Sequence, residues 1–347
     1  MELRNYPFEL ALRYPFSISR HTYHSIYTQI VELTYENLSG FGEATLNPYY
    51  GITRENLAEA FSHAASLLSH YTFKSPAKLW QHLREPLDKN FFALSAIDCA
   101  AHDLHGKLKG TTFGHMHGID YSKYPFTSYT LGIGDTETMI KKIRQFPWPV
   151  YKLKLGAPND LEIIREIRNH TQALLRIDAN GGWTLTQALE MSEALTNAGV
   201  EFVEQPLKME DWEKMDELHK KMAIPLFADE SCVREEDVLK CHGIFDGINV
   251  KLSKCGGLTP AMRMIEQARN LGMKVMIGCM TESTVGISAA AQLLPLVDYA
   301  DLDGPLLLKE NVATGIKFRN GYLILKNRNG LGFNFKYGKF EANPVKI

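Results

Sequence analysis

Three carboxylates stand at the ends of three successive apolar segments of this chain. They are Asp178, Glu204 and Asp229. Three carboxylates that converge would repel one another unless a cation neutralised them. A set of oxygen ligands without His or Cys selects a hard ion, so these residues predict a Mg²⁺ site, with Mn²⁺ as the second choice. Taken singly, each carboxylate has a plainer interpretation, as a helix cap or as the partner of an arginine such as Arg176.

Lysines occupy comparable positions on either side of the three carboxylates. Lys154 ends the apolar segment before them, and Lys251 ends the segment after them. A divalent cation and other lysines nearby disfavour the charged form of a lysine, which lowers its pKa toward the range of a general base. Two such bases on opposite faces of one metal-bound carboxylate suit a 1,1-proton transfer. The alternative for a single lysine at a strand end is a solvated surface charge.

Asp301 and Asp303 end the last apolar segment. Because strand side chains alternate between the two faces, these two carboxylates are expected on one face. Away from the metal they would form an anionic patch suited to an ammonium group. A turn that caps the following helix would use the same residues.

These residues need a scaffold that brings strand ends together, and the chain has the required period. From about residue 124, eight short apolar segments alternate with amphipathic ones, at residues 127–133, 150–156, 174–179, 202–207, 226–231, 247–252, 274–280 and 299–304. A strand, a helix and two short loops fill each repeat, which predicts a (β/α) barrel with its site at the carboxyl ends of the strands. A doubly wound sheet is the alternative, but Gly132 and Gly134 lack the third glycine of its nucleotide-binding fingerprint.

The two ends of the chain do not show the repeating pattern of the predicted barrel. Residues 27–35 alternate as a strand does, and residues 55–70 and 93–108 have helical periodicity, which together indicate an α+β unit. Near the other end, residues 321–325 and 333–335 resemble short strands that would pack back on this unit. The predicted domains are therefore a capping domain, 1–122, to which 310–347 returns, and a barrel domain, 123–309.

Composition narrows the functional classes. Lys and Arg total 38 and Asp and Glu total 40, so there is no basic surplus to bind nucleic acid. We expect no membrane segment and no secretory signal, because no long uncharged apolar run occurs. The five cysteines are an odd number without CxxC pairs, which is typical of reduced, buried thiols in the cytoplasm: Cys99, Cys232, Cys241, Cys255 and Cys279.

Five motifs in order resemble the enolase superfamily. They are Lys152-Leu153-Lys154, Asp178-Ala179-Asn180, Glu204-Gln205-Pro206, Ala228-Asp229-Glu230-Ser231 and the stretch from Asn249 to Gly257; residues 96–104 are also similar to a helix of its capping domain. Lysines on the second and sixth strands are those of the muconate lactonizing enzyme subgroup, whereas the mandelate racemase subgroup uses a His-Asp pair. The resemblance implies a (β/α)7β modified TIM barrel with an α+β capping domain. It also implies one Mg²⁺ per subunit and a Mg²⁺-stabilised enediolate, with Lys154 and Lys251 as acid and base.

Within this subgroup the chain resembles the dipeptide epimerases, which are isomerases. The resemblance implies that Asp301 and Asp303 hold the α-ammonium of a dipeptide and that Lys152 polarises its carboxylate. It further implies that Thr130, Cys279 and Thr281 line the substrate. The alternatives are an o-succinylbenzoate synthase or N-acylamino acid racemase, which need no ammonium clamp, and a non-catalytic barrel that binds a metal or a peptide.

One position departs from the family pattern. Epimerases that act on Ala-Glu carry an Arg in the N-terminal loop, where this chain has His21, with Arg20 next to it. Histidine is a weaker and pH-dependent partner for an anion. The expected substrate is therefore a free dipeptide, Ala-Xaa, with a small or apolar second residue that is inverted. A homo-oligomer is compatible with this chain.

Overall fold

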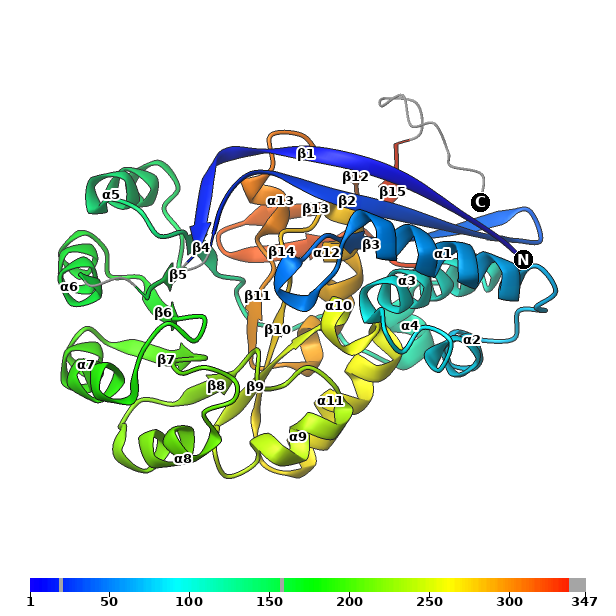
Figure 1. Cartoon of the computed structure of the whole chain (residues 1–347). Helices are drawn as coiled ribbons and strands as arrows, with labels where there is room; N and C mark the ends of the chain where they lie inside the picture. Colours follow the sequence, from blue (N-terminus) through cyan, green and yellow to red (C-terminus); the bar gives the residue numbers. More distant parts are fainter. Residues whose placement is uncertain (19–20, 157–158, 337–347) are drawn as a thin grey trace.

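The computed structural model describes residues 1–18, 21–156 and 159–336. An antiparallel sheet and a group of helices, formed by the N-terminal third, lie across one end of a larger parallel sheet with helices outside it (Figure 1). Among the described residues, no helix is long and apolar enough to cross a membrane.

The N-terminal unit joins a three-stranded sheet to four helices. Its elements are β1 (Glu2–Ile18), β2 (His21–Tyr35), β3 (Leu38–Thr45), α1 (Arg54–Leu68), α2 (Pro76–Arg84), α3 (Phe91–Leu108) and α4 (Phe113–His117), with a 3-10 turn, η1 (Pro48–Tyr50), after β3. Helix α3 packs tightly on β3, because a Cβ at Gly40 or Gly42 would lie within 2.1 Å of a carbonyl oxygen of this helix. This contact requires glycine at both positions.

The parallel sheet has eight strands in sequential order. They are β4 (Tyr129–Leu131), β5 (Val150–Lys154), β6 (Leu174–Asp178), β7 (Val200–Glu204), β8 (Leu226–Ala228), β9 (Gly247–Lys251), β10 (Lys274–Gly278) and β11 (Tyr299–Asp301). A parallel bridge between Thr127 and Ala300 joins the first strand to the last, and Ser128 N donates to Ala300 O at 3.1 Å. The predicted barrel is confirmed. The doubly wound alternative is wrong, since such a sheet reverses its strand order.

Helices follow the strands and cover the outside of the barrel (Figure 1). They are α5 (Thr136–Gln145), α6 (Asp160–His170), α7 (Leu185–Asn197), α8 (Trp212–Lys221), α9 (Glu235–Cys241), α10 (Leu252–Cys255), α11 (Leu258–Asn270), α12 (Thr284–Ala290) and the 3-10 helix η2 (Ala291–Leu296). Among the described residues after β11, the one helix is the one-turn α13 (Gly304–Leu307), which agrees with a (β/α)7β barrel.

The C-terminal segment forms two small antiparallel pairs, β12 (Ala313–Thr314) with β15 (Asn334–Phe335) and β13 (Ile316–Arg319) with β14 (Tyr322–Leu325). The ring of Phe335 lies 5.7 Å from Tyr6 and 5.1 Å from Phe41, both in the N-terminal sheet. The turn before β14 contacts the barrel, where Thr127 N donates to Gly321 O at 2.9 Å. The predicted return of residues 337–347 lies outside the described residues.

Candidate active site

The ends of β6, β7 and β8 bring Asp178, Glu204 and Asp229 together. One carboxylate oxygen from each lies within 4.8 Å of the others, and all three side chains are buried. Arg176, the alternative partner considered above, instead binds Glu201 at 2.8 Å. Three buried carboxylates with only oxygen to offer fit a hard divalent cation. The predicted convergence is therefore present.

Lys152 connects two of these carboxylates to Asp301. Asp301 and Asp303 together are called the clamp here. Its Nζ lies 2.9 Å from Asp178 Oδ2, 2.6 Å from Glu204 Oε2 and 2.7 Å from Asp301 Oδ2. Burial lowers the pKa of Lys152, but the three carboxylates outweigh it and hold the pKa well above its ordinary value. Asp301 is not part of the carboxylate triad, but the ammonium group of Lys152 links it to Asp178 and Glu204.

Lys154 and Lys251 approach the triad from opposite sides, on β5 and β9. Lys154 Nζ lies 2.5 Å from Asp178 Oδ2, and Lys251 Nζ lies 2.7 Å from Asp229 Oδ2. Burial lowers the pKa of Lys251, but Asp229 and Glu204 outweigh this effect and raise it above its ordinary value, so the fall expected beside a cation stays a prediction. The raised pKa follows from carboxylates whose charge a bound cation would offset.

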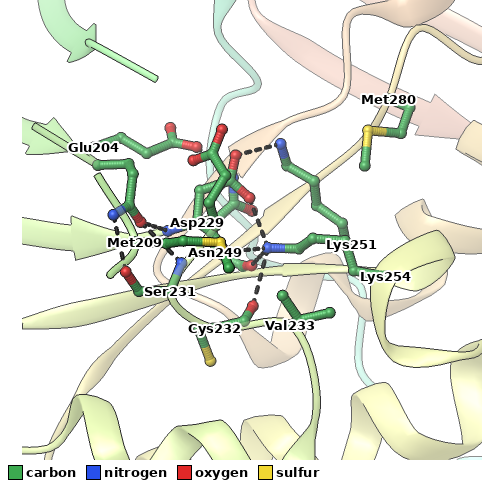
Figure 2. Close-up of polar contacts among 12 residues, drawn as sticks. Glu204, Met209, Asp229, Ser231, Cys232, Val233, Asn249, Lys251, Lys254 and Met280 are labelled. Atoms are coloured by element: carbon green, nitrogen blue, oxygen red, sulfur yellow. Dashed lines mark hydrogen bonds and ion pairs between the residues drawn. The ribbon is translucent and has the colours of Figure 1, made fainter. Parts of the chain in front are cut away.

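Lys254 is a functional-site residue to which the sequence assigned no role. Its Nζ donates to Asp229 Oδ1 and to the Asp229 carbonyl, both at 2.6 Å, and to the carbonyls of Cys232 at 3.0 Å and Asn249 at 3.1 Å (Figure 2). The side chain is fully buried. Its three N–H groups are shared among these four acceptors, and together the contacts fix the Asp229 carboxylate and the loop after β8. No local pattern distinguishes such a lysine from a surface one, since its partners lie 5 to 25 residues away.

Two amide side chains help to position Glu204 and Asp229. Asn249 Nδ2 donates to Glu204 Oε1 at 2.8 Å. Gln205 has a positive φ of 38°, and its Oε1 accepts from Asp229 N and Ser231 N, both at 3.0 Å. The strained backbone at Gln205 is thus compensated by bonds that place the third carboxylate.

The clamp residues lie where the last strand meets the first. Asp301 Oδ1 accepts from Ser128 Oγ at 2.5 Å, and Asp303 Oδ2 accepts from Thr130 N at 2.6 Å. Burial alone would raise the pKa of Asp301, but Lys152 lowers it below its ordinary value. Burial and the charge of Asp301 raise the pKa of Asp303 to about 7. The pair forms an anionic end of the site.

A cavity of about 460 Å³ opens over these groups. The barrel contributes polar residues to it: Thr130, Lys154, Asn180, Asp229, Glu230, Lys251, Cys279, Thr281, Asp301 and Asp303. The described residues of the N-terminal unit that line it are uncharged: Phe16, Tyr23, Ile26, Thr45, Leu46, Asn47, Pro48, Tyr49 and Tyr50. Met280 and Leu307 add further apolar surface. Cavities of this size hold small molecules.

For several residues that line the cavity, the sequence alone gave no indication of this position. Asn180, whose Oδ1 accepts from Lys154 Nζ at 3.3 Å, and Glu230 belong to motifs quoted above, but their spacing alone gave them no role. The lining residues of the N-terminal unit come from chain far from the barrel. His21 begins β2, and its side chain lies outside the described residues. Cys279, expected to be buried, is partly exposed and lines the cavity, whereas the other four cysteines are buried.

A buried acid, Glu282, lies just behind the cavity wall. Burial, together with the negative charge of Glu43, raises its pKa from 4.5 to about 8, although Lys251 opposes this shift. The folded protein therefore keeps this carboxyl protonated at neutral pH, whereas an unfolded chain does not.

We expect Glu282→Gln to make the protein more stable at high pH. The stabilisation by the protonated acid is complete below about pH 4.5 and is lost as the pH rises through about 8, and Gln has no proton to lose. The gain over the parent should grow across this window to a few kcal/mol, on the order of 1.4 kcal/mol for each pKa unit. Urea unfolding at pH 5.5, 7 and 8.5 measures it. Glu266→Gln, on the exposed face of α11, is the matched control, and an equal gain at all three pH values would contradict the assignment.

Comparisons with known proteins agree with this geometry. Residues 2–118 match the N-terminal domain of mandelate racemase / muconate lactonizing enzyme, and residues 137–339 match the enolase C-terminal domain-like family. The chain is 46% identical over 330 residues to an L-Ala-D/L-amino acid epimerase from Flavobacterium johnsoniae, covering 95% of this chain and 98% of that protein. It is 37% identical over 346 residues to an L-Ala-D/L-Glu epimerase from Bacteroides thetaiotaomicron, covering 96% and 87%. A dipeptide epimerase from Cytophaga hutchinsonii, solved with Mg and D-Ala-L-Val, superposes with a TM-score of 0.92 at 26% identity, covering 97% and 96%.

Proposed function

Since this chain belongs to the mandelate racemase and muconate lactonizing enzyme family of the enolase superfamily, we propose that it is a dipeptide epimerase, an isomerase that inverts the second residue of a free dipeptide. The observation that carries the proposal is one cavity with two lysines on opposite sides of a carboxylate triad and an anionic pair beyond it.

In this proposal Asp178, Glu204 and Asp229 hold one Mg²⁺, and Mn²⁺ is the alternative ion. When bound, the metal would stabilise the negative charge that builds up on the substrate carboxylate as its α-proton leaves. Lys152 lies against two of the three ligands and adds a positive charge to the same region. Asn249 and Lys254 hold Glu204 and Asp229 in place through the bonds described above.

Lys154 and Lys251 perform the proton transfer in the proposed mechanism. One lysine removes the α-proton from one face, and the other returns a proton to the opposite face, so the configuration inverts. Their roles exchange with the direction of the reaction. The placement of the two lysines on different strands, β5 and β9, supports this division.

Asp301 and Asp303 bind the α-ammonium of the first residue in the proposed complex, and Thr130, Cys279 and Thr281 line the peptide. Charge-assisted hydrogen bonds to two buried carboxylates are strong. The second side chain points toward the N-terminal unit, whose described lining residues carry no charge. A small or apolar second residue, as in Ala-Val, suits this wall, and D-Ala-L-Val in the Cytophaga hutchinsonii complex supports it.

We expect free dipeptides to be preferred over N-acetylated ones by at least about a hundredfold in kcat/KM. An acetyl group removes the cation that Asp301 and Asp303 would bind, and it brings no replacement charge to these buried carboxylates, at a cost of roughly 2–5 kcal/mol. L-Ala-L-Val, its N-acetyl derivative, N-acetyl-L-Val and L-Ala-L-Glu are compared with Mg²⁺ in deuterated water, and α-deuterium is read by mass. Faster turnover of an N-acetyl compound would indicate an N-acylamino acid racemase. Faster turnover of L-Ala-L-Glu would contradict the apolar wall.

The domain division stays part of the proposal, with residues 1–122 and 310–347 in the capping unit and 123–309 in the barrel. The two family matches, which end at 118 and begin at 137, support a boundary between these positions. We also propose a cytoplasmic location, which five free thiols support. Homo-oligomer formation stays a prediction, and light scattering tests it.

A further inference from the structure

One wall of the cavity is formed by residues 279–284, called here the wall segment, which joins β10 to α12. Cys279, Met280 and Thr281 line the cavity from it. A single carboxylate of the N-terminal unit, Glu43 on β3, holds the other end of this segment.

Glu43 is buried and accepts hydrogen bonds from both units. Ser283 N donates to its Oε1 at 2.9 Å, Ser283 Oγ donates to Oε2 at 2.6 Å, and Gly286 N donates to Oε2 at 2.9 Å. Thr28 Oγ1, from β2, donates to Oε1 at 3.0 Å. The backbone N–H groups of Ser283 and Gly286 can only donate, so both carboxylate oxygens of Glu43 serve as acceptors. Burial raises the pKa of Glu43, and the bonds from Ser283, Gly286 and Thr28 oppose this shift.

The wall segment in turn touches Asp301 and Gly304, the residue that follows Asp303. Cys279 Sγ donates to Asp301 O at 3.2 Å. Gly304, the neighbour of Asp303, packs so closely on the segment that a Cβ there would lie 2.6 Å from Glu282 O. A shift of the segment would therefore press directly on the backbone that carries the clamp, because packed contacts of this kind have no free volume to absorb it.

We infer that Glu43 is a positioning residue for substrate binding, which acts through the wall segment on the Asp301 and Asp303 clamp. The inference rests on the proposed function for the identity of the substrate. Glu43 itself does not line the cavity, so its effect on a dipeptide passes through Ser283 and the backbone after β10.

The chain contains a matched control for this role. Asp98, on α3, is also a buried carboxylate of the N-terminal unit that binds the start of a barrel helix. Thr259 N donates to its Oδ2 at 2.9 Å, and Thr259 Oγ1 donates to its Oδ1 at 2.7 Å. The start of α11 does not line the cavity. Asp98→Asn therefore weakens the contact between the same two units without touching the wall segment.

The experiment compares Glu43→Gln with Asp98→Asn at pH 7.5 with Mg²⁺. Glu43→Gln should raise KM for a free dipeptide about tenfold or more with a much smaller change in kcat, because lost clamp geometry weakens ground-state and transition-state binding alike. Both variants should lower the unfolding midpoint by a similar amount, but Asp98→Asn should leave KM within about twofold of the value for the parent protein. Equal KM changes in the two variants would overturn the inference, since both would then report only a loosened interface.

A second readout needs no substrate. Cys279 is the cysteine that is not buried, so its rate of labelling by a maleimide, located by peptide mass, reports the wall segment. Glu43→Gln should accelerate this labelling about tenfold, and Asp98→Asn should not. An unchanged labelling rate in Glu43→Gln would overturn the inference. If the parent protein turned over no dipeptide, the proposed function would be contradicted, but the labelling rates of the two variants could still be compared. If Glu43→Gln fails to fold, Thr28→Val takes its place, because it removes one of the four hydrogen bonds to Glu43. It should accelerate the labelling of Cys279 to a smaller extent, and an unchanged labelling rate would again overturn the inference.

Discussion

Net epimerisation should stop when either Lys154 or Lys251 is replaced by Ala. In the proposed mechanism each face of the α-carbon is served by one lysine, as a neutral amine when it removes the proton and as an ammonium when it returns one. The two lysines lie on opposite sides of the triad, so neither can replace the other. General acid–base groups contribute about 10²–10⁴-fold each, and inversion needs both. Chiral chromatography of L-Ala-L-Val after incubation measures the loss.

Isotope exchange separates the two lysines. In deuterated water, the surviving lysine should still exchange the α-proton of one epimer, without inversion, so each variant should label a different epimer. Lys240→Ala, which removes an exposed lysine of α9 that pairs with Asp237, is the control and should keep full activity. Complete epimerisation by either active-site variant would rule out the two-base mechanism.

Glu204→Gln should cost several orders of magnitude in kcat and most of the Mg²⁺ affinity. The substitution removes a charged ligand at the centre of the triad. It also removes the carboxylate oxygen that lies 2.6 Å from Lys152 Nζ in the parent protein, so this buried ammonium group loses one charged partner. Neutral amide oxygens are poorer ligands for a hard cation than carboxylates. Calorimetric titration with Mg²⁺ and dipeptide turnover measure the two losses.

A control on the same strand separates ligand loss from damage to the barrel. Glu201 also lies on β7 and pairs with Arg176 at 2.8 Å, so Glu201→Gln removes a paired carboxylate three residues away and should keep Mg²⁺ affinity. Chelation of the parent protein should abolish turnover, and added Mg²⁺ should restore it. Full turnover after exhaustive chelation would contradict the metal assignment.

The barrel and the centre of the site could be predicted from sequence because both are encoded locally. Each strand is a short apolar run with a regular interval to the next, and a parallel barrel gathers the residues that end those runs. Asp178, Glu204 and Asp229 were therefore expected to meet before any contact was known.

What the sequence could not predict depends on pairs far apart in the chain. Lys152 and Asp301 are 149 residues apart, and no local pattern predicts the ion pair by which Lys152 links the carboxylate triad to the clamp. Lys254 has the composition of a surface residue and acquires its role only from the carbonyls that surround it. The fall expected in the pKa of Lys251 assumed a cation, whereas the carboxylates of the protein alone raise it.

The joint between β4 and β11 has a consequence for how new specificities arise. In the described part of the chain, one backbone bridge closes the barrel there, and the carboxylates of Asp301 and Asp303 add bonds to Ser128 and Thr130 across the same joint. The residues proposed to bind the ammonium group of the substrate therefore also close the scaffold. A lineage that exchanges its ammonium clamp for another recognition group loses part of this closure at once, so stabilising changes elsewhere must come first.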